Sequence, residues 1–309
     1  MLTAGERREG VDATSQPVVG VVGLGTMGGA MAQHLLTAGY QVIGRDVEPA
    51  SEQRFAAAGG TVAKSAAAVA AAVDVAILSL PSVAAFEDVV YGPQGFTDAG
   101  STRCRIVVET STLPRELKKS AHTVLAAHGL ELLDCPISGT GGQMAVRDVI
   151  YYASGDELAI DAVEPLLRAC GRGVFRLGAF GNGTRLKLIA NLLVTIHNAS
   201  AAEALALARA GGIDPGDALP ALVAGAGTSR MLEVRGPMMV AEEYEPAAMK
   251  VRLFMKDVGI ISVFAEEAGC TVPVFEAAAR LHEEALEAGF GEADPASVHA
   301  VARRRRLPS

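Results

Sequence analysis

The residue with the clearest chemical potential is Lys187, near the start of a long apolar stretch at 183–209. At helical spacing Asn191 lies on the same line as Lys187, in a polar stripe, while leucines and isoleucines cover the rest of the circumference. An ammonium group in apolar surroundings is costly unless it is paired, neutralised or facing a polar cavity, so such a lysine is a candidate proton acceptor. A lysine that reaches solvent along its aliphatic stem remains the alternative.

Three glycines in the segment GLGTMG, residues 23–28, form a second group with recognisable chemistry. They follow the apolar run VVGVV and precede a helical stretch. In that position Gly23 permits a tight turn, Gly25 lets the backbone approach a pyrophosphate, and Gly28 lets the helix pack closely on the strand. The N-terminus of the helix then faces the phosphates. These glycines predict a dinucleotide site.

The choice of dinucleotide depends on the segment YQVIGRD, which ends in Asp46. A carboxylate at this distance from the glycines binds both ribose hydroxyls of NAD and repels the 2′-phosphate of NADP, so we expect NAD. The neighbouring Arg45 and Arg54 leave NADP open, because an arginine near the strand end can bind the 2′-phosphate. The segment LSLPS, with Leu80 and Pro81, ends another strand at the same edge and forms either the adenosine side or an ordinary turn.

Polar side chains also follow two later strand-like runs, in Glu109–Thr112 and Asp134–Gly142. In the second, Ser138 and Gly139 offer a hydroxyl and backbone N–H groups that can approach a carboxylate or carbonyl oxygen. Ordinary turn chemistry explains the same residues equally well at this point. Ligands of open α/β sheets bind beyond the carboxyl ends of the strands, where both runs are expected to lie.

The first half of the chain alternates β-branched runs with helical segments. Six runs are predicted strands: PVVGVVGLG, YQVIGRD, VDVAILSL, RIVVET, LELLDCPIS and VIYYAS. This alternation predicts an α/β fold with a doubly wound, mostly parallel sheet of the Rossmann type. Beyond residue 183 the strand pattern stops, and the second half is predicted to be all-α. Its helices are expected to end near Arg209, Gly225, Glu242, Gly269 and Gly289.

These patterns divide the chain into four segments. Residues 1–16 are expected to form a flexible leader, 17–182 a dinucleotide-binding Rossmann domain, 183–300 an all-helical domain for substrate and oligomer contacts, and 301–309 a basic tail. The formal charge of -8 and the pI near 5.3 give no reason to expect nucleic acid or a membrane as partner. The leader lacks a signal-peptide pattern and the four cysteines lie far apart, so reduced thiols in the cytoplasm are expected, without a cysteine metal site.

The order of the motifs resembles the β-hydroxyacid dehydrogenase family, typified by 3-hydroxyisobutyrate dehydrogenase. GLGTMG, TST, DCPISG, GNGTRLKLIAN and FMKD follow one another as in the family, over nearly the whole chain. The resemblance implies a Rossmann domain, a long interdomain helix and an all-helical C-terminal domain like that of 6-phosphogluconate dehydrogenase, assembled as homodimers or homotetramers. It also implies hydride transfer, without a metal, between NAD or NADP and a small carboxylate substrate.

The resemblance also implies roles for individual residues. Lys187, in the family's GxGxxxKxxxN motif, is the implied general acid/base, and Asn191 orients the substrate or Lys187. The implied substrate-binding residues are Ser138, Gly139, Thr140 and Thr112, the last of them near the nicotinamide. The implied cofactor-binding residues are Gly23, Leu24, Gly25, Thr26, Met27, Gly28, Asp46, Leu80, Pro81, Thr112 and Lys256. From the residues alone, Lys256 and Asp257 are interpreted as an exposed charge pair on a helix.

Several residues depart from the family's pattern and concern the substrate. Thr140 stands where a second glycine is usual, and Arg147 stands where another glycine is expected. Arg147 either binds a second anionic group or points to solvent, and Arg230 and Arg235 are also unusual for an isobutyrate-type enzyme. A larger or more polar substrate, such as a sugar acid or a β-hydroxy amino acid, is therefore an alternative to 3-hydroxyisobutyrate.

Three further alternatives concern the reaction class: a reductase of a related aldehyde acid, an imine reductase, and a non-enzymatic dinucleotide-sensing module. In imine reductases another residue typically replaces Lys187, and a sensor has no use for a base beside the nicotinamide. Lys187 and Asn191 together count against both. Four histidines are expected to be structural and do not displace Lys187 as the base: His34, His122, His128 and His197.

Overall fold

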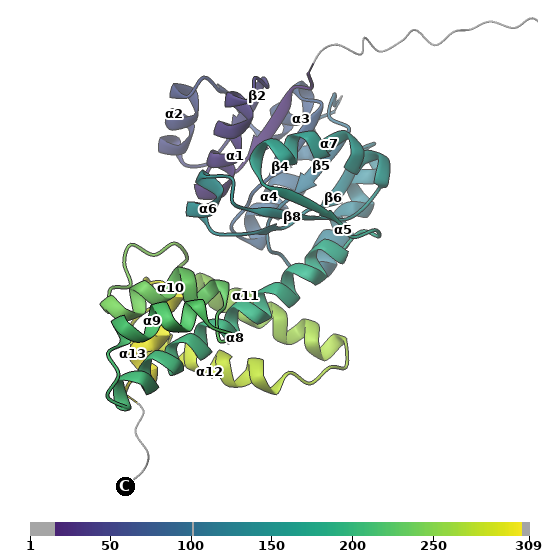
Figure 1. Ribbon diagram of the computed structural model, residues 1–309. Coiled ribbons are helices and arrows are strands. Elements are labelled where there is room, and N and C mark those ends of the chain that lie inside the picture. Colours follow the sequence, from purple (N-terminus) through teal and green to yellow (C-terminus); the bar gives the residue numbers. More distant parts are fainter. Residues whose placement is uncertain (1–15, 101, 305–309) are drawn as a thin grey trace, which may run out of the picture. The chain divides into compact units, whose positions relative to one another are not determined.

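The computed structural model describes residues 16–100 and 102–304, which form two compact units (Figure 1). Of the described residues, the first unit contains those up to Glu109 together with Ala121–Leu132. The second contains Thr110–Ser120 and the residues from Leu133 onward. The predicted leader, except for Gln16, and residues 305–309 of the predicted basic tail lie outside the described residues.

A six-stranded sheet is the central element of the first unit, which contains all of it except Leu133 and Asp134 at the end of the last strand. Its strands are β1 (Val19–Val22), β2 (Val42–Arg45), β3 (Thr61–Val62), β4 (Val75–Leu78), β5 (Ile106–Glu109) and β6 (Glu131–Asp134), in the order β3-β2-β1-β4-β5-β6. β1 pairs in parallel with β2 on one side and with β4 on the other. The strand order reverses direction there, so right-handed crossovers place helices on both faces of the sheet. The predicted doubly wound α/β fold is confirmed.

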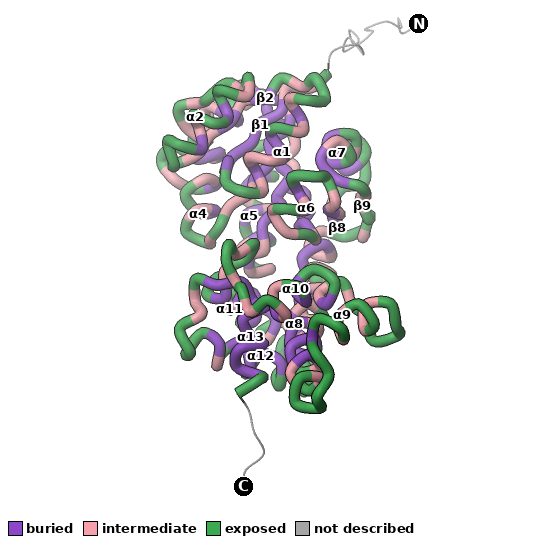
Figure 2. The backbone as a smooth tube through the Cα atoms, turned by 60° about the vertical axis from the view of Figure 1, so that its left-hand side comes forward, coloured by how far each residue is buried: buried purple, intermediate pink, exposed green. Residues whose placement is uncertain are grey.

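The strands form where valines and isoleucines follow one another, because strands of parallel sheets are covered on both faces. All four residues of β1 and of β4 are buried, as the colour of β1 in Figure 2 shows. Ser65 and Ser82 begin α3 and α4 as N-caps, each accepting a hydrogen bond from the N–H three residues later. The helices between the strands are α1 (Thr26–Thr37), α2 (Pro49–Ala57), α3 (Ala66–Ala72), α4 (Val83–Tyr91) and α5 (Arg115–Ala127), with a 3-10 turn at Phe96–Asp98.

The predicted strand LELLDCPIS is two strands, and VIYYAS does not belong to the six-stranded sheet. Pro136 has no N–H for a ladder hydrogen bond, and the run divides there into β6 and β7 (Ile137–Ser138). β7 pairs antiparallel with β8 (Ile150–Ala153), and β8 pairs in parallel with β9 (Gly173–Arg176), so the second unit has a separate three-stranded sheet. The connecting helices are α6 (Gly141–Ala145) and α7 (Glu157–Cys170). No run predicted β3 or β9: β3 has only two residues, both exposed, and no residue of β9 is fully buried, so neither shows the apolar pattern of a buried strand.

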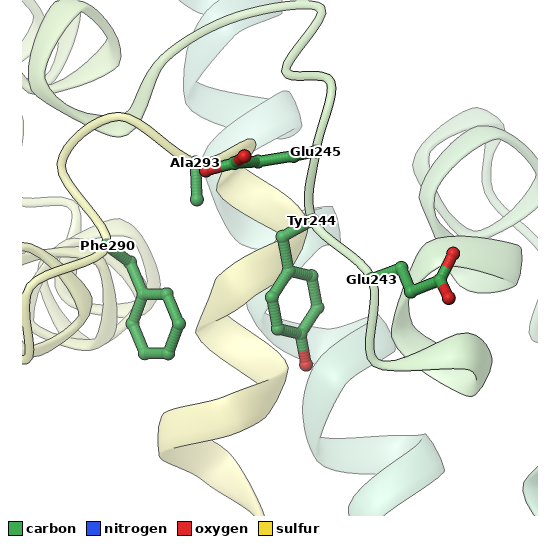
Figure 3. Close-up of a pocket in the computed structure, with 5 residues that line it drawn as sticks. All are labelled: Glu243, Tyr244, Glu245, Phe290 and Ala293. Carbon is green, nitrogen blue, oxygen red and sulfur yellow. The ribbon is translucent and has the colours of Figure 1, made fainter.

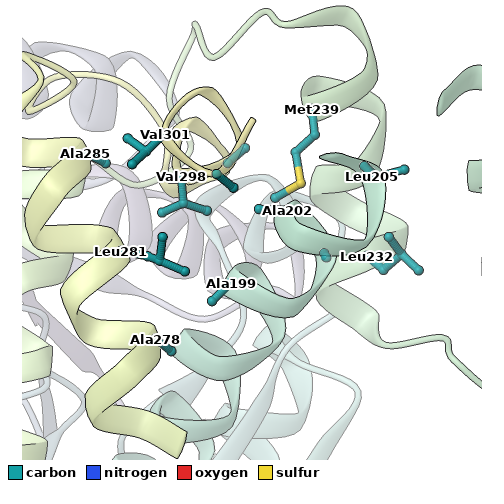
Figure 4. Packing of buried hydrophobic residues seen from close by; sticks show 13 residues of the cluster. Ala199, Ala202, Leu205, Leu232, Met239, Ala278, Leu281, Ala285, Val298 and Val301 are labelled. Carbon is teal, nitrogen blue, oxygen red and sulfur yellow. The ribbon is translucent and has the colours of Figure 1, made fainter. Parts of the chain in front are cut away.

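The predicted all-helical second half is confirmed, and its helices end close to the predicted positions. The helices are α8 (Asn182–Ala210), α9 (Pro215–Ala224), α10 (Arg230–Ala241), α11 (Val251–Glu267) and α12 (Pro273–Glu287), followed by a 3-10 turn at Pro295–Ser297 and α13 (Val298–Ala302). In the core, Ala199 and Ala202 of α8 pack with Met239 of α10, Leu281 of α12 and Val298 of α13 (Figure 4). The small alanine side chains allow these helices to pack closely around α8.

By length and composition, α8 is the one helix in 16–100 and 102–304 that could cross a membrane, with a mean hydropathy of 1.2 over its most apolar stretch. The core helix of a globular domain meets the same criterion. Five other helices, α9 to α13, pack on α8. Its buried residues include four polar ones: Thr184, Asn191, Thr195 and Asn198. We therefore interpret α8 as the core helix of the second unit.

Candidate active site

The three glycines of GLGTMG adopt the geometries that a dinucleotide loop requires. Gly23 follows β1 with a φ of 91°, and a Cβ there would lie 2.2 Å from the Ser79 carbonyl oxygen. Gly28 packs on the same loop, where a Cβ would lie 1.8 Å from the Gly23 carbonyl oxygen. Gly25 has open space around an added Cβ and precedes α1 without a side-chain cap. The described residues therefore leave the first N–H groups of α1 accessible to an anion.

Asp46 lies beside this loop, directly after β2. Its Oδ2 accepts a hydrogen bond of 2.5 Å from the Leu24 N–H, and its Oδ1 accepts one of 2.8 Å from the Glu48 N–H. Arg45 forms an ion pair of 2.6 Å with Glu52. This guanidinium therefore already has a carboxylate partner.

The remaining loop residues implied by the resemblance lie at the ends of neighbouring elements. Thr26 and Met27 form the first turn of α1, and Leu80 and Pro81 follow β4. Arg54, on α2, donates a hydrogen bond of 2.9 Å to the Ser51 hydroxyl. The glycine geometry, the uncapped helix N-terminus and the Asp46 carboxylate together fit a dinucleotide of the NAD type.

The N-terminus of α8 is anchored by the buried carboxylate of Asp134. The N–H and the hydroxyl of Thr184 each donate a hydrogen bond of 2.7 Å to this carboxylate. Lys118 Nζ pairs with it at 2.9 Å, and both members of the ion pair are almost completely buried. A negative charge is favourable at a helix N-terminus. The pair therefore fixes the point from which α8 presents Lys187.

Gly183 allows α8 to begin directly against the backbone of the second unit. Its N–H donates a hydrogen bond of 2.9 Å to the Ser154 hydroxyl, which in turn donates to the Asp134 carbonyl oxygen at 3.1 Å. A Cβ on Gly183 would lie 2.3 Å from the Tyr152 carbonyl oxygen and 2.6 Å from that of Asp134. Only a glycine fits this close approach.

Lys187 lies in the second turn of α8, and its side chain is half-buried. Burial is the main cause that lowers the pKa of the Lys187 ammonium group, Lys256 lowers it further, and Asp257 opposes the shift. A lowered pKa favours the neutral amine, which is the form that accepts a proton. This environment favours a proton-transfer role over that of a solvated surface lysine.

Asn191 follows Lys187 by one helical turn and is buried. Its Nδ2 donates a hydrogen bond of 3.0 Å to Oδ2 of Asp257 on α11. Lys256 donates a hydrogen bond of 3.0 Å to the Thr112 carbonyl oxygen and lies 3.4 Å from Oδ1 of Asp257. The interpretation of Lys256 and Asp257 as an exposed pair is wrong for Asp257, which is only 6% exposed. The structure thus joins three of the implied site residues, Asn191, Lys256 and Thr112, through Asp257.

Ser138, Gly139 and Thr140 lie where β7 turns into α6. Gly139 has a φ of 148°, and a Cβ there would lie 2.5 Å from the Val149 side chain. Thr140 forms a capping box with Gln143: its hydroxyl accepts a hydrogen bond from the Gln143 N–H, and the Gln143 side chain accepts one from the Thr140 N–H. The cap occupies the Thr140 hydroxyl, so Ser138 and Gly139 are the better candidates for contacts with a substrate.

The three unusual arginines occupy different environments. Arg147 is exposed, with a φ of 59°, and Arg230 is exposed and pairs with Asp148 at 3.0 Å. Arg235 is buried and pairs with the buried Asp294 at 2.7 Å. Arg235 therefore stabilises the helical core and is not available to a substrate.

The sequence did not reveal Asp134, Lys118 or Asp257 as supports of the site. Asp134 belongs to a polar cluster at a strand end, which gives a weak signal. Lys118 and Lys119 are adjacent in a helix pattern, and nothing local distinguishes the buried lysine from the exposed one. The only feature of the sequence that points to Asp257 as part of the site is its position beside Lys256 in the motif FMKD.

A pocket in the helical region is lined by Glu243, Tyr244, Glu245, Phe290 and Ala293 (Figure 3). The Tyr244 and Phe290 rings meet edge to face, with 5.9 Å between their centroids. Two glutamates without a cation among the lining residues disfavour a carboxylate ligand. This pocket therefore does not fit the substrate class that the motifs indicate.

A glycine loop between β1 and α1, and a half-buried lysine of lowered pKa held in a core helix, define a pyridine-nucleotide-dependent oxidoreductase. Comparison with protein families agrees with this class. Residues 18–178 match the NAD binding domain of 6-phosphogluconate dehydrogenase. Residues 181–302 match the NAD-binding family of NADP-dependent 3-hydroxyisobutyrate dehydrogenase. The chain belongs to the β-hydroxyacid dehydrogenase family, as its motifs predicted.

Individual relatives cover nearly the whole chain. The L-threonate dehydrogenase of Cupriavidus necator is 34% identical over 291 residues, which are 94% of this chain and 97% of the relative. The 2-hydroxy-3-oxopropionate reductase of Escherichia coli is 30% identical over 257 residues, 82% of this chain and 86% of the relative. The crystal structure of a 3-hydroxyisobutyrate dehydrogenase from Salmonella typhimurium has a TM-score of 0.82 at 31% identity, covering 92% of this chain and 99% of that one. The protein is therefore an NAD(P)-dependent dehydrogenase that acts on a CH–OH group of a small molecule.

Proposed function

We propose that the protein oxidises a small β-hydroxyacid with NAD and reduces the corresponding carbonyl acid in reverse, with Lys187 as general acid/base. The observation that carries this proposal is the half-buried Lys187 of lowered pKa, one turn before the buried Asn191. Within the class, a polyhydroxylated acid of the L-threonate type is favoured over 3-hydroxyisobutyrate. Support comes from relatives named L-threonate dehydrogenase in several bacteria, which are 29% to 34% identical.

The proposed reaction gives a role to each candidate site residue in the second unit. The bound cofactor supplies the hydride acceptor for oxidation and the hydride donor for reduction. Lys187 Nζ accepts the proton of the substrate hydroxyl during oxidation and returns it during reduction. Asn191 orients the substrate or Lys187, and Ser138 and Gly139 bind the substrate carboxylate. Thr140 contributes to substrate binding through its capping box with Gln143, which fixes the turn that presents these two residues. Thr112 and Lys256 lie on the nicotinamide side.

The first unit is proposed to hold the cofactor. The N–H groups of Gly25, Thr26, Met27 and the rest of the first α1 turn would bind the pyrophosphate, and Asp46 would bind the ribose hydroxyls. Leu80 and Pro81 would line the adenosine side. The ion pair between Arg45 and Glu52 supports NAD as the preferred cofactor. We further propose a homodimer or homotetramer that works in the cytoplasm.

Turnover with a panel of acids tests this proposal. The panel contains L-threonate, 3-hydroxyisobutyrate, L-serine, glycerate and 4-hydroxybutyrate, each with NAD and with NADP. Turnover is expected to be fastest with L-threonate and NAD. Lys187→Ala should lower kcat by about 100-fold to 10,000-fold while leaving NADH binding nearly unchanged, because only proton transfer is removed. The matched control is Arg185→Ala, which removes an exposed cation from the same helix.

The outcomes separate the alternatives. Unchanged turnover in Lys187→Ala would reject Lys187 as the acid/base. Preference for 3-hydroxyisobutyrate or L-serine would keep the reaction and replace the substrate. Turnover of a cyclic imine but of no acid would establish the imine reductase alternative, and tight NADH binding without turnover of any compound would support the sensing module.

A further inference from the structure

Asp257 is a buried carboxylate that packing alone does not explain. It lies on α11, is 6% exposed, and touches the Asn191 amide on one oxygen and the Lys256 ammonium on the other. Burying an ionised carboxylate is costly unless cations and hydrogen bonds stabilise it. Burial raises the pKa of the Asp257 carboxyl, and Lys256, Lys187 and the Asn191 hydrogen bond oppose this shift. Each group that stabilises the ionised form therefore belongs to the candidate site.

The contact with Asp257 decides the orientation of the Asn191 amide. An ionised carboxylate can only accept hydrogen bonds, so it must face the Nδ2 arm of the amide. The contact of 3.0 Å between Nδ2 and Asp257 Oδ2 has this geometry. The planar amide then directs its carbonyl oxygen Oδ1 away from Asp257. Asn191 thus presents Oδ1 as an acceptor, suited to an ammonium or to a substrate hydroxyl, while one N–H of Nδ2 is used by Asp257.

The same carboxylate acts electrostatically on Lys187. Among the described residues, the charged groups that act on Lys187 are Asp257 and Lys256, both on α11. Lys256 favours the neutral amine, whereas Asp257 favours the ammonium form. Burial and these two opposed charges therefore act together on the pKa of the Lys187 ammonium group.

We propose that Asp257 is a positioning residue for this reaction: its carboxylate holds the Asn191 amide with Oδ1 presented as acceptor, and its charge sets the pH range over which Lys187 works. The inference rests on the proposed role of Lys187 as acid/base. It concerns only residues of the second unit and assigns to Asp257 no direct contact with the substrate.

The test compares the pH dependence of kcat/KM for oxidation in the wild type, Asp257→Asn and Asp257→Glu. Oxidation needs the neutral amine, so the rate rises with pH through the pKa of Lys187. Removing the opposing negative charge in Asp257→Asn should move this acid limb to lower pH, by about one pH unit, since a nearby opposite charge shifts a pKa by about 1–3 units. kcat on the plateau should fall about tenfold, because Asn191 is no longer fixed in one orientation. Asp257→Glu keeps the charge and should keep the acid limb near its wild-type position.

Glu267→Gln is the matched control, because it removes an exposed carboxylate, paired with Arg115, from the same helix α11. Its acid limb should stay in place. NMR titration of isotope-labelled lysines in the cofactor-free protein, with Lys187→Ala to assign the signal, measures the same shift without turnover. If Asp257→Asn does not fold, Asp257→Ser supplies the same test in the NMR titration: the Lys187 titration should move to lower pH, and an unmoved titration overturns the proposal.

A purely structural Asp257 would give a different result. Asp257→Asn would then lower the melting temperature, and kcat would fall by the same factor at every pH. The acid limb and the NMR titration of Lys187 would stay at their wild-type pH. That result overturns the proposal. If Lys187→Ala loses turnover but the acid limb of the pH profile does not move in Asp257→Asn, the role of Asp257 is rejected and the proposed function stands. If no acid is turned over by the wild type, the proposed function fails, and the NMR titration still decides whether Asp257 acts on Lys187.

Discussion

At the scale of single residues, the buried ion pair between Lys118 and Asp134 stands out. The Asp134 carboxylate is held by the first turn of α8 as well as by Lys118, so it joins α5, β6 and α8 within the second unit. A buried ion pair contributes little compared with a well-packed apolar pair, yet losing one partner leaves an uncompensated charge in the interior. The position of α8 therefore depends on Lys118 being charged and in place.

Replacing Lys118 tests this dependence. Lys118→Met should lower the free energy of unfolding by about 3–5 kcal/mol, because the Asp134 carboxylate loses its cation in a buried position. Lys119→Met is the control: Lys119 is the next residue along the chain, its side chain is 75% exposed, and its loss should cost less than about 1 kcal/mol. Urea denaturation followed by circular dichroism measures both. Equal stabilities of the two variants would show that the buried pair does not anchor α8.

At the scale of elements, α8 carries both Lys187 and Asn191, and its placement decides whether the two residues can act. The helix begins at a glycine-rich turn in which Gly181 has a φ of 90° and Gly183 touches two backbone carbonyl groups. Side chains are excluded at Gly183 for a steric reason. The glycines of the motif GNGTRLKLIAN therefore form a turn and also let the start of α8 pack closely against the neighbouring backbone.

Two glycine-to-alanine variants distinguish the steric requirement for glycine at the start of α8 from the general effect of alanine on helix stability. Gly183→Ala should lower the free energy of unfolding by about 1–3 kcal/mol and reduce kcat, because α8 must shift to make room for the methyl group. Gly259→Ala, inside α11 with open space around the added Cβ, should raise it by about 0.4–1 kcal/mol, because alanine is the better helix former. Thermal denaturation and steady-state rates measure both effects. Stabilisation by Gly183→Ala would contradict the close approach seen in the structure.

At the scale of the whole molecule, the stability of the fold depends on pH through a histidine far along the chain from Lys187. His282, on α12, is fully buried beside the Phe254 ring, with 4.8 Å between the ring centroids. Burial lowers the pKa of His282 to about 4, and Arg235 adds to this shift. The native state therefore binds the proton less readily than the unfolded chain, whose histidine keeps a pKa near 6.5.

The sign of the pH effect follows from this difference. Between about pH 6.5 and pH 4 the unfolded chain binds more protons, so the free energy of unfolding should fall as the pH is lowered, by up to about 3 kcal/mol from His282. His282→Leu removes this titration, and its stability should decline less steeply over the same range. Urea denaturation of both proteins at pH 7.5, 6 and 5 measures the difference in slope. Parallel declines in the two proteins would exclude His282 as the source.

The sequence alone determined the features that depend on local pattern. The glycine loop, the alternation of strands and helices, the extent of α8 to α12 and the stripe that joins Lys187 to Asn191 are set by spacing along the chain, and the structure contains all of them. Spacing is informative there because the periods of helix and strand fix which residues share a face.

Only the tertiary structure decided the features that depend on which elements meet. Asp257 becomes the partner of Asn191 because α11 packs on α8, and Lys118 rather than Lys119 becomes the buried cation because that face of α5 meets Asp134. VIYYAS joins a second sheet because its pairing partners are β7 and β9. Charge and burial of a side chain are set by neighbours distant in sequence, and no local period specifies those neighbours.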